Sequence, residues 1–470
     1  MPTTIRLAHR LSIAATAVLV LLGAFRPASA VPVFARKYQT SCQTCHVAFP
    51  KLNPFGEAFR LNGYRMPAET EDQVKETPMS LGSEAYKKTW PAMVYPGSIP
   101  GHVPIAINIK MADVYSSEFD GTSASVTKND FQFPQEVNLF TAGTLGEKFG
   151  FLAELTFEQG EGVSIERAQF TANSVGGPEH AVNFKVGMFA PDLADGFQEM
   201  WLMTNNGIDS MFSYNPIGVR GGTSLAEEGG GISIPSNVQA IEFYGVAKHR
   251  FFYTVGLTNG LGAVPTDLLT SNPHATGTDP HSSKDWYARF DYKFGGMGLD
   301  GDTTGKSLPP ENWRENSVRV GLLGYHGSGD DVAFAVSDEL GSPFDVVDRS
   351  YDRYGLYVSW LWRDLNVFGV YLHGKDALTV TDSTTLAENR IDPTYDSWFV
   401  QADYVIRPPF QVSLRYEDLS PGDPTAKAIR LGNANFTYLM LANIKLMLEY
   451  QRDLEESKNY NVAAVLRLAF

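Results

Sequence analysis

The stretch from Tyr354 to Trp362 reads YGLYVSWLW, and its side chains alternate between two kinds. Every even-numbered residue, from Tyr354 to Trp362, is large and apolar. Gly355, Tyr357 and Ser359 fall between them and would point to the opposite side of an extended chain. A period of two is typical of a β-strand, because successive side chains of a strand face opposite ways.

The same alternation recurs at 286–294, 412–417 and 444–451 and continues to the last residue, Phe470. One face is apolar with aromatic ends, and the other carries charges of both signs. Strands of soluble sandwiches average about 5–6 residues, whereas these repeats run to about ten, as membrane barrels require. Lipid offers no partner for a bare sheet edge, so such a sheet must close. We therefore predict an all-β fold, an antiparallel outer-membrane β-barrel of about sixteen strands.

The predicted strands also give the barrel its orientation. They lie near residues 103–116, 132–145, 147–159, 163–175, 180–190, 238–248, 250–259, 284–294, 315–326, 352–362, 364–374, 395–407, 408–418, 427–440, 442–453 and 458–470. Tight turns alternate with long loops, which places the start of the first strand on the periplasmic side, because short turns face the periplasm. Two connections break the rule: 295–314 is too long and 160–162 is too short.

The longest predicted loop, 191–237, follows the fifth strand. It contains Met200, Trp201, Met203, Met211 and Phe212, which are too apolar for a loop in water. We expect it to fold into the lumen and pack there.

The start of the chain predicts export. Residues 1–30 have a basic beginning, a short apolar run and a small-residue cleavage site at Ala28–Ala30, which together indicate a signal peptide. No later apolar run approaches the ~18 residues of a spanning helix. The net charge of -15 argues against a nucleic-acid partner.

The two cysteines of the chain, Cys42 and Cys45, stand three apart and are followed by His46. C-x-x-C-H is the attachment signature of a c-type haem, in which both thiols bond the porphyrin and the histidine is the proximal iron ligand. A disulfide is the alternative in an oxidising compartment. A thioredoxin-like pair would need a βαβ context, and a zinc site would need a fourth ligand.

The distal iron ligand is open among four residues. We expect Met79 first and Met66 second, with Met93 and His102 as further candidates. The haem-bearing domain is predicted at 31–100, with a short helix at 55–62, and the barrel at 101–470. Residues 67–100 hold too few apolar side chains for a core of their own, so this domain needs haem and a host surface.

A signal peptide, one C-x-x-C-H and about sixteen strands resemble the fused monohaem cytochrome–porins, best known as outer-membrane iron-oxidising cytochromes. The stretch from Phe34 to Tyr64, FARKYQTSCQTCHVAFPKLNPFGEAFRLNGY, is similar to that family's cytochrome segment. The resemblance implies one covalent haem c at Cys42, Cys45 and His46, in a segment that plugs the barrel in the bacterial outer membrane. It also implies electron flow from extracellular Fe(II) or a similar donor to a periplasmic c-type cytochrome or similar carrier.

Two other functions fit the same features. One is a porin-type channel that the haem segment gates or plugs. The other is a conduit that carries electrons outward. No nucleophile paired with a base and no phosphate-binding loop is recognisable, so enzyme activity beyond Fe(II) oxidation has no support. The sequence does not decide the oligomeric state.

Overall fold

The computed structural model describes most of the chain. The described residues are 33–67, 77, 79–94, 98–101, 103–119, 125–146, 148–158, 162–212, 214, 234, 237–259, 284–302, 311–330, 335–337, 343–382, 388–424 and 426–470. The predicted signal peptide, 1–30, and the candidate ligand His102 lie outside them.

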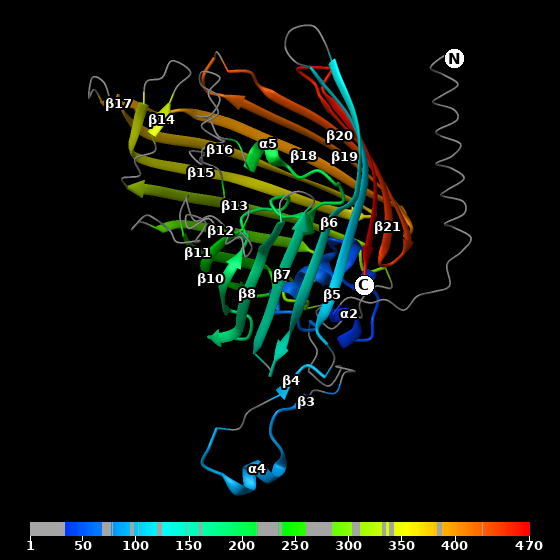
Figure 1. Ribbon diagram of the computed structural model, residues 1–470. Coiled ribbons are helices and arrows are strands. Elements are labelled where there is room, and N and C mark those ends of the chain that lie inside the picture. Colours follow the sequence, from blue (N-terminus) through cyan, green and yellow to red (C-terminus); the bar gives the residue numbers. More distant parts are fainter. Residues whose placement is uncertain are drawn as a thin grey trace.

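One closed antiparallel β-barrel accounts for most of the described residues (Figure 1). Its sheet holds eighteen strands, of which β14 (Ala335–Ser337) and β17 (Glu388–Ile391) are short additions beside β15 and β16. The other sixteen are β5 (Ile105–Phe119), β6 (Ser125–Leu145), β7 (Phe149–Glu158), β8 (Gly162–Gly176), β9 (Val182–Phe189), β10 (Val238–Ala247), β11 (Phe251–Asn259), β12 (Lys284–Gly295), β13 (Glu315–Asp330), β15 (Pro343–Arg363), β16 (Leu365–Asp382), β18 (Thr394–Arg407), β19 (Phe410–Pro421), β20 (Ile429–Leu441), β21 (Ile444–Asp453) and β22 (Tyr460–Ala469). The barrel closes where β22 pairs with β5.

The predicted sixteen-stranded antiparallel barrel is confirmed, and most strand ends agree within a few residues. The differences lie at the long-loop end, where β6 begins at Ser125, β15 begins at Pro343 and β16 continues to Asp382. Alternation cannot reveal these extensions because, beyond an apolar band, both faces of a strand can carry polar side chains.

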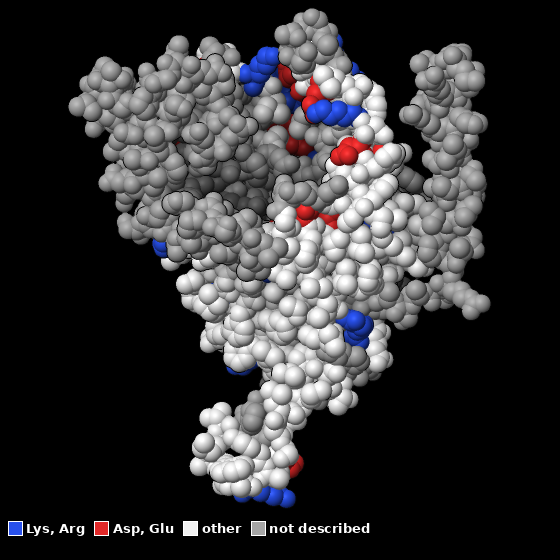
Figure 2. Space-filling model, viewed as in Figure 1, with Lys and Arg blue, Asp and Glu red and all other residues white. Residues whose placement is uncertain are grey.

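The two faces of the barrel differ as the alternation predicted. In β15, Trp360 is 42% exposed on the outside, whereas its neighbour Ser359 is 6% exposed in the lumen. The described outer wall in Figure 2 is largely uncharged, and the charged groups in view gather toward the two ends. Arg289, Asp291 and Arg319 point inward and are buried.

The long connection after β12 is explained by what it contacts. Asn312 donates hydrogen bonds to the carbonyl oxygens of Gln43 and Thr44, at 2.8 and 2.7 Å. Asn62 donates to the carbonyl oxygen of Asp300, at 2.9 Å. This connection therefore supports the N-terminal segment instead of making a tight turn.

The described N-terminal segment has two parts. Residues 33–67, here called the plug, lie inside the barrel at the short-turn end. The plug contains α2 (Val33–Lys37), η1 (Cys42–Thr44), β1 (His46–Ala48), β2 (Lys51–Leu52) and α3 (Pro54–Leu61). The projecting segment, with β3 (Met79–Ser80), α4 (Glu84–Thr89) and β4 (Ser98–Ile99), hangs below the barrel in Figure 1. Among the described residues, no helix is long and apolar enough to cross a membrane.

Candidate functional site

The C-x-x-C-H motif forms a compact turn inside the barrel. Cys42 opens the 3-10 helix η1, Cys45 caps its end, and the Ser41 side chain accepts a hydrogen bond from the Gln43 amide. Positions i and i+3 eclipse each other in a 3-10 helix, so both cysteines lie on one side of the turn. The two thiols are free and partly exposed. The predicted disulfide alternative is therefore not formed in this structure.

The His46 ring has a fixed orientation. Its Nδ1 lies 3.0 Å from the carbonyl oxygen of Pro50. A carbonyl can only accept, so Nδ1 carries the proton and Nε2 keeps its lone pair. Burial lowers the pKa of His46 to about 4, which keeps the imidazole neutral at physiological pH. A neutral histidine whose other nitrogen is tied to a backbone carbonyl is the usual state of an iron ligand.

Helix α3 packs directly against this turn. Asn53 caps α3 by accepting from the Gly56 amide at 2.9 Å, and its side chain donates to the Gln43 and Thr44 carbonyls at 3.2 and 3.1 Å. A Cβ atom on Gly56 would lie 2.0 Å from the Cys45 carbonyl oxygen. Only glycine therefore allows this close approach.

The thiols are in chemically quiet surroundings. Burial raises the pKa of Cys42 to about 11 and that of Cys45 to about 12, so both stay protonated at neutral pH. Redox-active and metal-binding cysteines are thiolates at neutral pH. Among the described residues, no group of three or more His, Cys, Asp or Glu side chains could hold a bare metal ion. The donor set fits a haem bound through thioether bonds and one histidine.

The candidate distal ligands lie in different places. Met79 and Met93 belong to the projecting segment and are 55% and 62% exposed. Met66 lies in the plug, where it packs with Cys45 on the cluster of Tyr38, Phe59 and Tyr64. The structure thus places Met66, but neither Met79 nor Met93, on the cluster that also contacts Cys45.

Ion pairs tie the plug to the barrel and to the lumen loop, residues 191–237. Glu57 of α3 pairs with Arg319 of β13, and Arg60 pairs with Asp192 of the loop at 2.7 Å. A chain of five ion pairs runs from α3 through the wall and the loop and back to α3, and it consists of Glu57, Arg319, Asp291, Arg289, Asp192 and Arg60. Burial alone would raise the pKa of Asp192, but the Arg60 and Arg289 guanidinium groups outweigh it and hold this pKa below its usual range.

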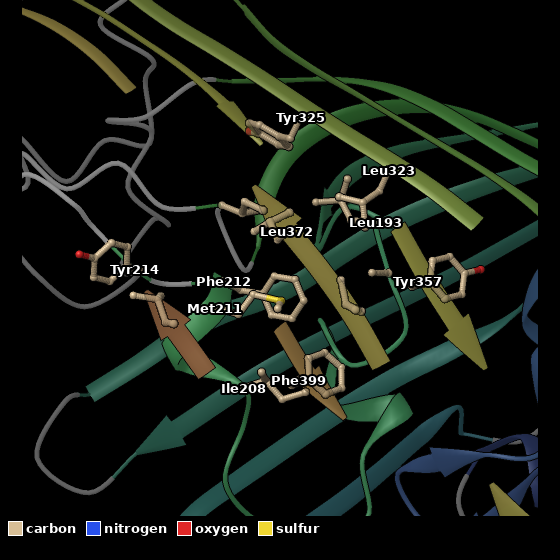
Figure 3. Packing of buried hydrophobic residues seen from close by; sticks show 14 of the residues in the cluster. Leu193, Ile208, Met211, Phe212, Tyr214, Leu323, Tyr325, Tyr357, Leu372 and Phe399 are labelled. Atoms are coloured by element: carbon tan, nitrogen blue, oxygen red, sulfur yellow. The ribbon is translucent and has the colours of Figure 1, made fainter. Parts of the chain in front are cut away.

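The described part of the lumen loop fills the barrel, as its composition predicted. Met211 and Phe212 pack on wall residues that include Tyr357 and Phe399 (Figure 3). Met203 contacts Ala48 of the plug and Leu439 of β20. A pocket of about 70 Å³ lies between plug, loop and wall.

The sequence did not reveal the residues that support the site. Two of them, Asn312 and Asp192, are remote in sequence from the two thiols. The third, Gly56, belongs to no recognisable motif. One signal was available, because the unusual length of the 295–314 connection marked it as more than a turn.

Comparisons with known proteins bear on the fold. No family model and no curated protein matches the chain. OmpF of Salmonella typhi, in complex with daunomycin, is 8% identical, with 78% of this chain and 97% of that chain covered and a TM-score of 0.50. The channel DcaP of Acinetobacter baumannii is 14% identical, with 78% and 96% covered and a TM-score of 0.44. OmpT of Vibrio cholerae is 9% identical, with 78% and 97% covered and a TM-score of 0.43. The likeness to OmpF, with a TM-score of 0.50, is one of fold, and the chain has a porin-like barrel of sixteen strands.

Proposed function

We propose that this protein is an outer-membrane barrel whose plug carries one covalent haem c and transfers electrons between the two sides of the membrane. The observation that carries the proposal is the C-x-x-C-H turn inside the lumen, with His46 Nδ1 tied to Pro50. The exposed apolar band of the wall, with Trp360 and Trp362 in it, supports insertion into lipid.

The residues of the turn would divide the work of holding the haem. Cys42 and Cys45 would form the thioether bonds, and His46 would offer Nε2 to the iron. Of the candidate distal ligands, Met66 is favoured by its contact with the cluster that holds Cys45. A haem c bound in this way would supply reversible one-electron chemistry.

The remaining plug residues would fix the position of that group. Glu57, Arg60 and Lys51 pair with buried charges of the wall and the lumen loop, which immobilises the plug. The described parts of the lumen loop and the plug pack together inside the barrel, and burial of a haem tunes its potential.

The donor is proposed to be extracellular Fe(II) or a similar reductant, and the acceptor a periplasmic c-type cytochrome or similar carrier. Flow in the opposite direction uses the same site. The test has two stages. Covalent haem is first measured by the absorbance of the denatured, reduced protein, with Cys42→Ser as control. The air-oxidised protein is then mixed with Fe(II) in a stopped-flow spectrometer.

Fast, saturable reduction by Fe(II) supports the inward direction. If dithionite reduces the haem but Fe(II) does not, the electron-conduit proposal stands and Fe(II) is excluded as the donor. A protein that carries no covalent haem in a cytochrome c-maturing host contradicts the electron-transfer proposal.

A second candidate is a porin-type channel gated by the plug, and the similarity of the barrel to porins favours it. With plug and lumen loop in place, such a channel would be closed. Planar-bilayer conductance decides between the two. A gated channel gives discrete openings, and residues 33–67 suppress them. A pure electron conduit gives no openings in the same recordings.

A further inference from the structure

Arg60 is only partly satisfied. It lies in α3 between the plug and the lumen loop, and its Nη1 donates to Asp192 at 2.7 Å. Its Nε and Nη2 are buried and have no hydrogen-bond acceptor among the described residues. Asp192 accepts from neither of these two nitrogens, and its other oxygen accepts from Arg289 at 3.0 Å.

A neighbouring side chain has the same deficit. The ring of Trp201, in the lumen loop, lies 5.7 Å from the Arg60 guanidinium carbon. The Trp201 Nε1 is also buried without an acceptor in the described part of the chain. Each buried, unpaired donor costs roughly 1–3 kcal/mol. Three such donors on two touching side chains indicate that an acceptor group belongs between plug and loop.

A pocket of about 50 Å³ adjoins Arg60, whereas Trp201 lines the pocket of about 70 Å³. The lining of the smaller pocket includes the cations Arg60, Arg167 and Lys185 and the carboxylates Asp192 and Glu242. Each water-sized group needs about 10–15 Å³ of such volume, so the pocket has room for about four. A carboxylate group fits this space and matches the planar fork of a guanidinium.

We propose that Arg60 forms a carboxylate site, and that the carboxylate is a propionate of haem c. The proposal rests on the proposed function, because the haem supplies the group. Tyr64 lines the pocket and also belongs to the cluster that packs against Cys45, so one set of side chains joins the pocket to the haem-attachment turn. The propionates of a porphyrin stand on the edge opposite its vinyl groups, away from the thioether bonds.

A free carboxylate in the lumen would present the same chemistry. The test therefore compares the midpoint potential of the haem, across a pH series, in the wild-type protein and in Arg60→Gln. Loss of a cation beside the propionate should lower the potential and add a pH-dependent step, because the propionate then protonates at higher pH. Arg60→Lys should restore most of the wild-type value.

Two control variants separate this effect from damage to the plug. Arg36→Gln removes a plug guanidinium that donates instead to the Val103 and Ile105 carbonyls, and it should leave the potential nearly unchanged. Asp192→Asn breaks the same ion pair as Arg60→Gln but removes a negative charge, so it should raise the potential.

The outcomes distinguish the inference from the proposed function. Haem present, with equal potentials in wild type and Arg60→Gln, overturns the propionate assignment. Suppose that added acetate raises the unfolding temperature of the wild type but not of Arg60→Gln. If the potentials stay equal in that case, the propionate assignment is also overturned, because the ligand is then a free carboxylate. Absence of covalent haem refutes the proposed function, and the acetate series alone then supports or overturns the carboxylate site.

Discussion

Replacing Gly56 by alanine sets two opposing effects against each other. In an ordinary helix the change stabilises by up to about 1 kcal/mol, because alanine has the higher helix propensity. Here the new methyl group would lie 2.0 Å from the Cys45 carbonyl oxygen, 2.8 Å from its carbon and 3.0 Å from its Cα. These are backbone atoms, so the turn and α3 must separate. Overpacking of this kind costs about 1–3 kcal/mol.

The severe overlap puts the cost near the upper end, so we expect a net loss of about 2 kcal/mol from the local stability of the plug, because the propensity gain offsets only part of it. Amide hydrogen exchange measures this directly, and exchange across α3 should become about 30-fold faster. Gly324→Ala is the matched control, since no atom lies within 4 Å of its added Cβ. Slower exchange across α3 in Gly56→Ala would refute the close packing of helix and turn.

Four further predictions concern the plug and the wall. Arg319→Ala leaves the Glu57 carboxylate buried without its partner, which costs about 3–5 kcal/mol, and limited proteolysis should then cut residues 33–67; an intact plug would contradict the ion-pair reasoning. Asn312→Ala removes both hydrogen bonds to the cysteine turn, at about 1 kcal/mol each, and the yield of covalent haem should fall while the barrel still folds. Leu356→Arg puts a charge on the outer face and should lower the folding free energy in lipid vesicles by about 2–4 kcal/mol; no loss would mean that this face does not meet lipid. The pKa of Asp192 lies below its unfolded value of about 3.9, so its stabilising effect is complete above that pH and is lost as the pH falls below it. The barrel should therefore stay closed in planar-bilayer recordings from pH 7 to 5. Opening within that range would show that Asp192 does not control opening.

The barrel could be predicted from the sequence because its period of two is a local property. Each strand that crosses an apolar band must alternate, so stretches such as 354–362 reveal both the strand and its two faces. The outer ends of β6, β15 and β16 were not predicted, because strand pairing continues there although the side chains no longer alternate between apolar and polar. The turn around Cys42 and Cys45 is equally local, because the three-residue spacing of the two cysteines is read directly from the sequence.

The surroundings of that turn could not be predicted, because they depend on which distant segments meet. Arg60 and Asp192 are brought together by the closed barrel and not by any local pattern. The expected order of distal ligands illustrates the same limit. Met79 and Met66 are equivalent as residues, and only the path of the chain separates one in the projecting segment from one in the plug.

The chain of ion pairs through Arg289 bears on how the molecule is assembled. The sheet closes only when β5 meets β22, strands from opposite ends of the barrel sequence. The ion-pair partners of Glu57 and Arg60 lie between them, on β13 and the loop after β9, and Arg289 of β12 continues the chain. A half-built, still open sheet therefore already presents these ion-pair partners to residues 33–67. The plug can serve as the template around which the wall curves, so that nothing needs to be threaded into a finished cylinder.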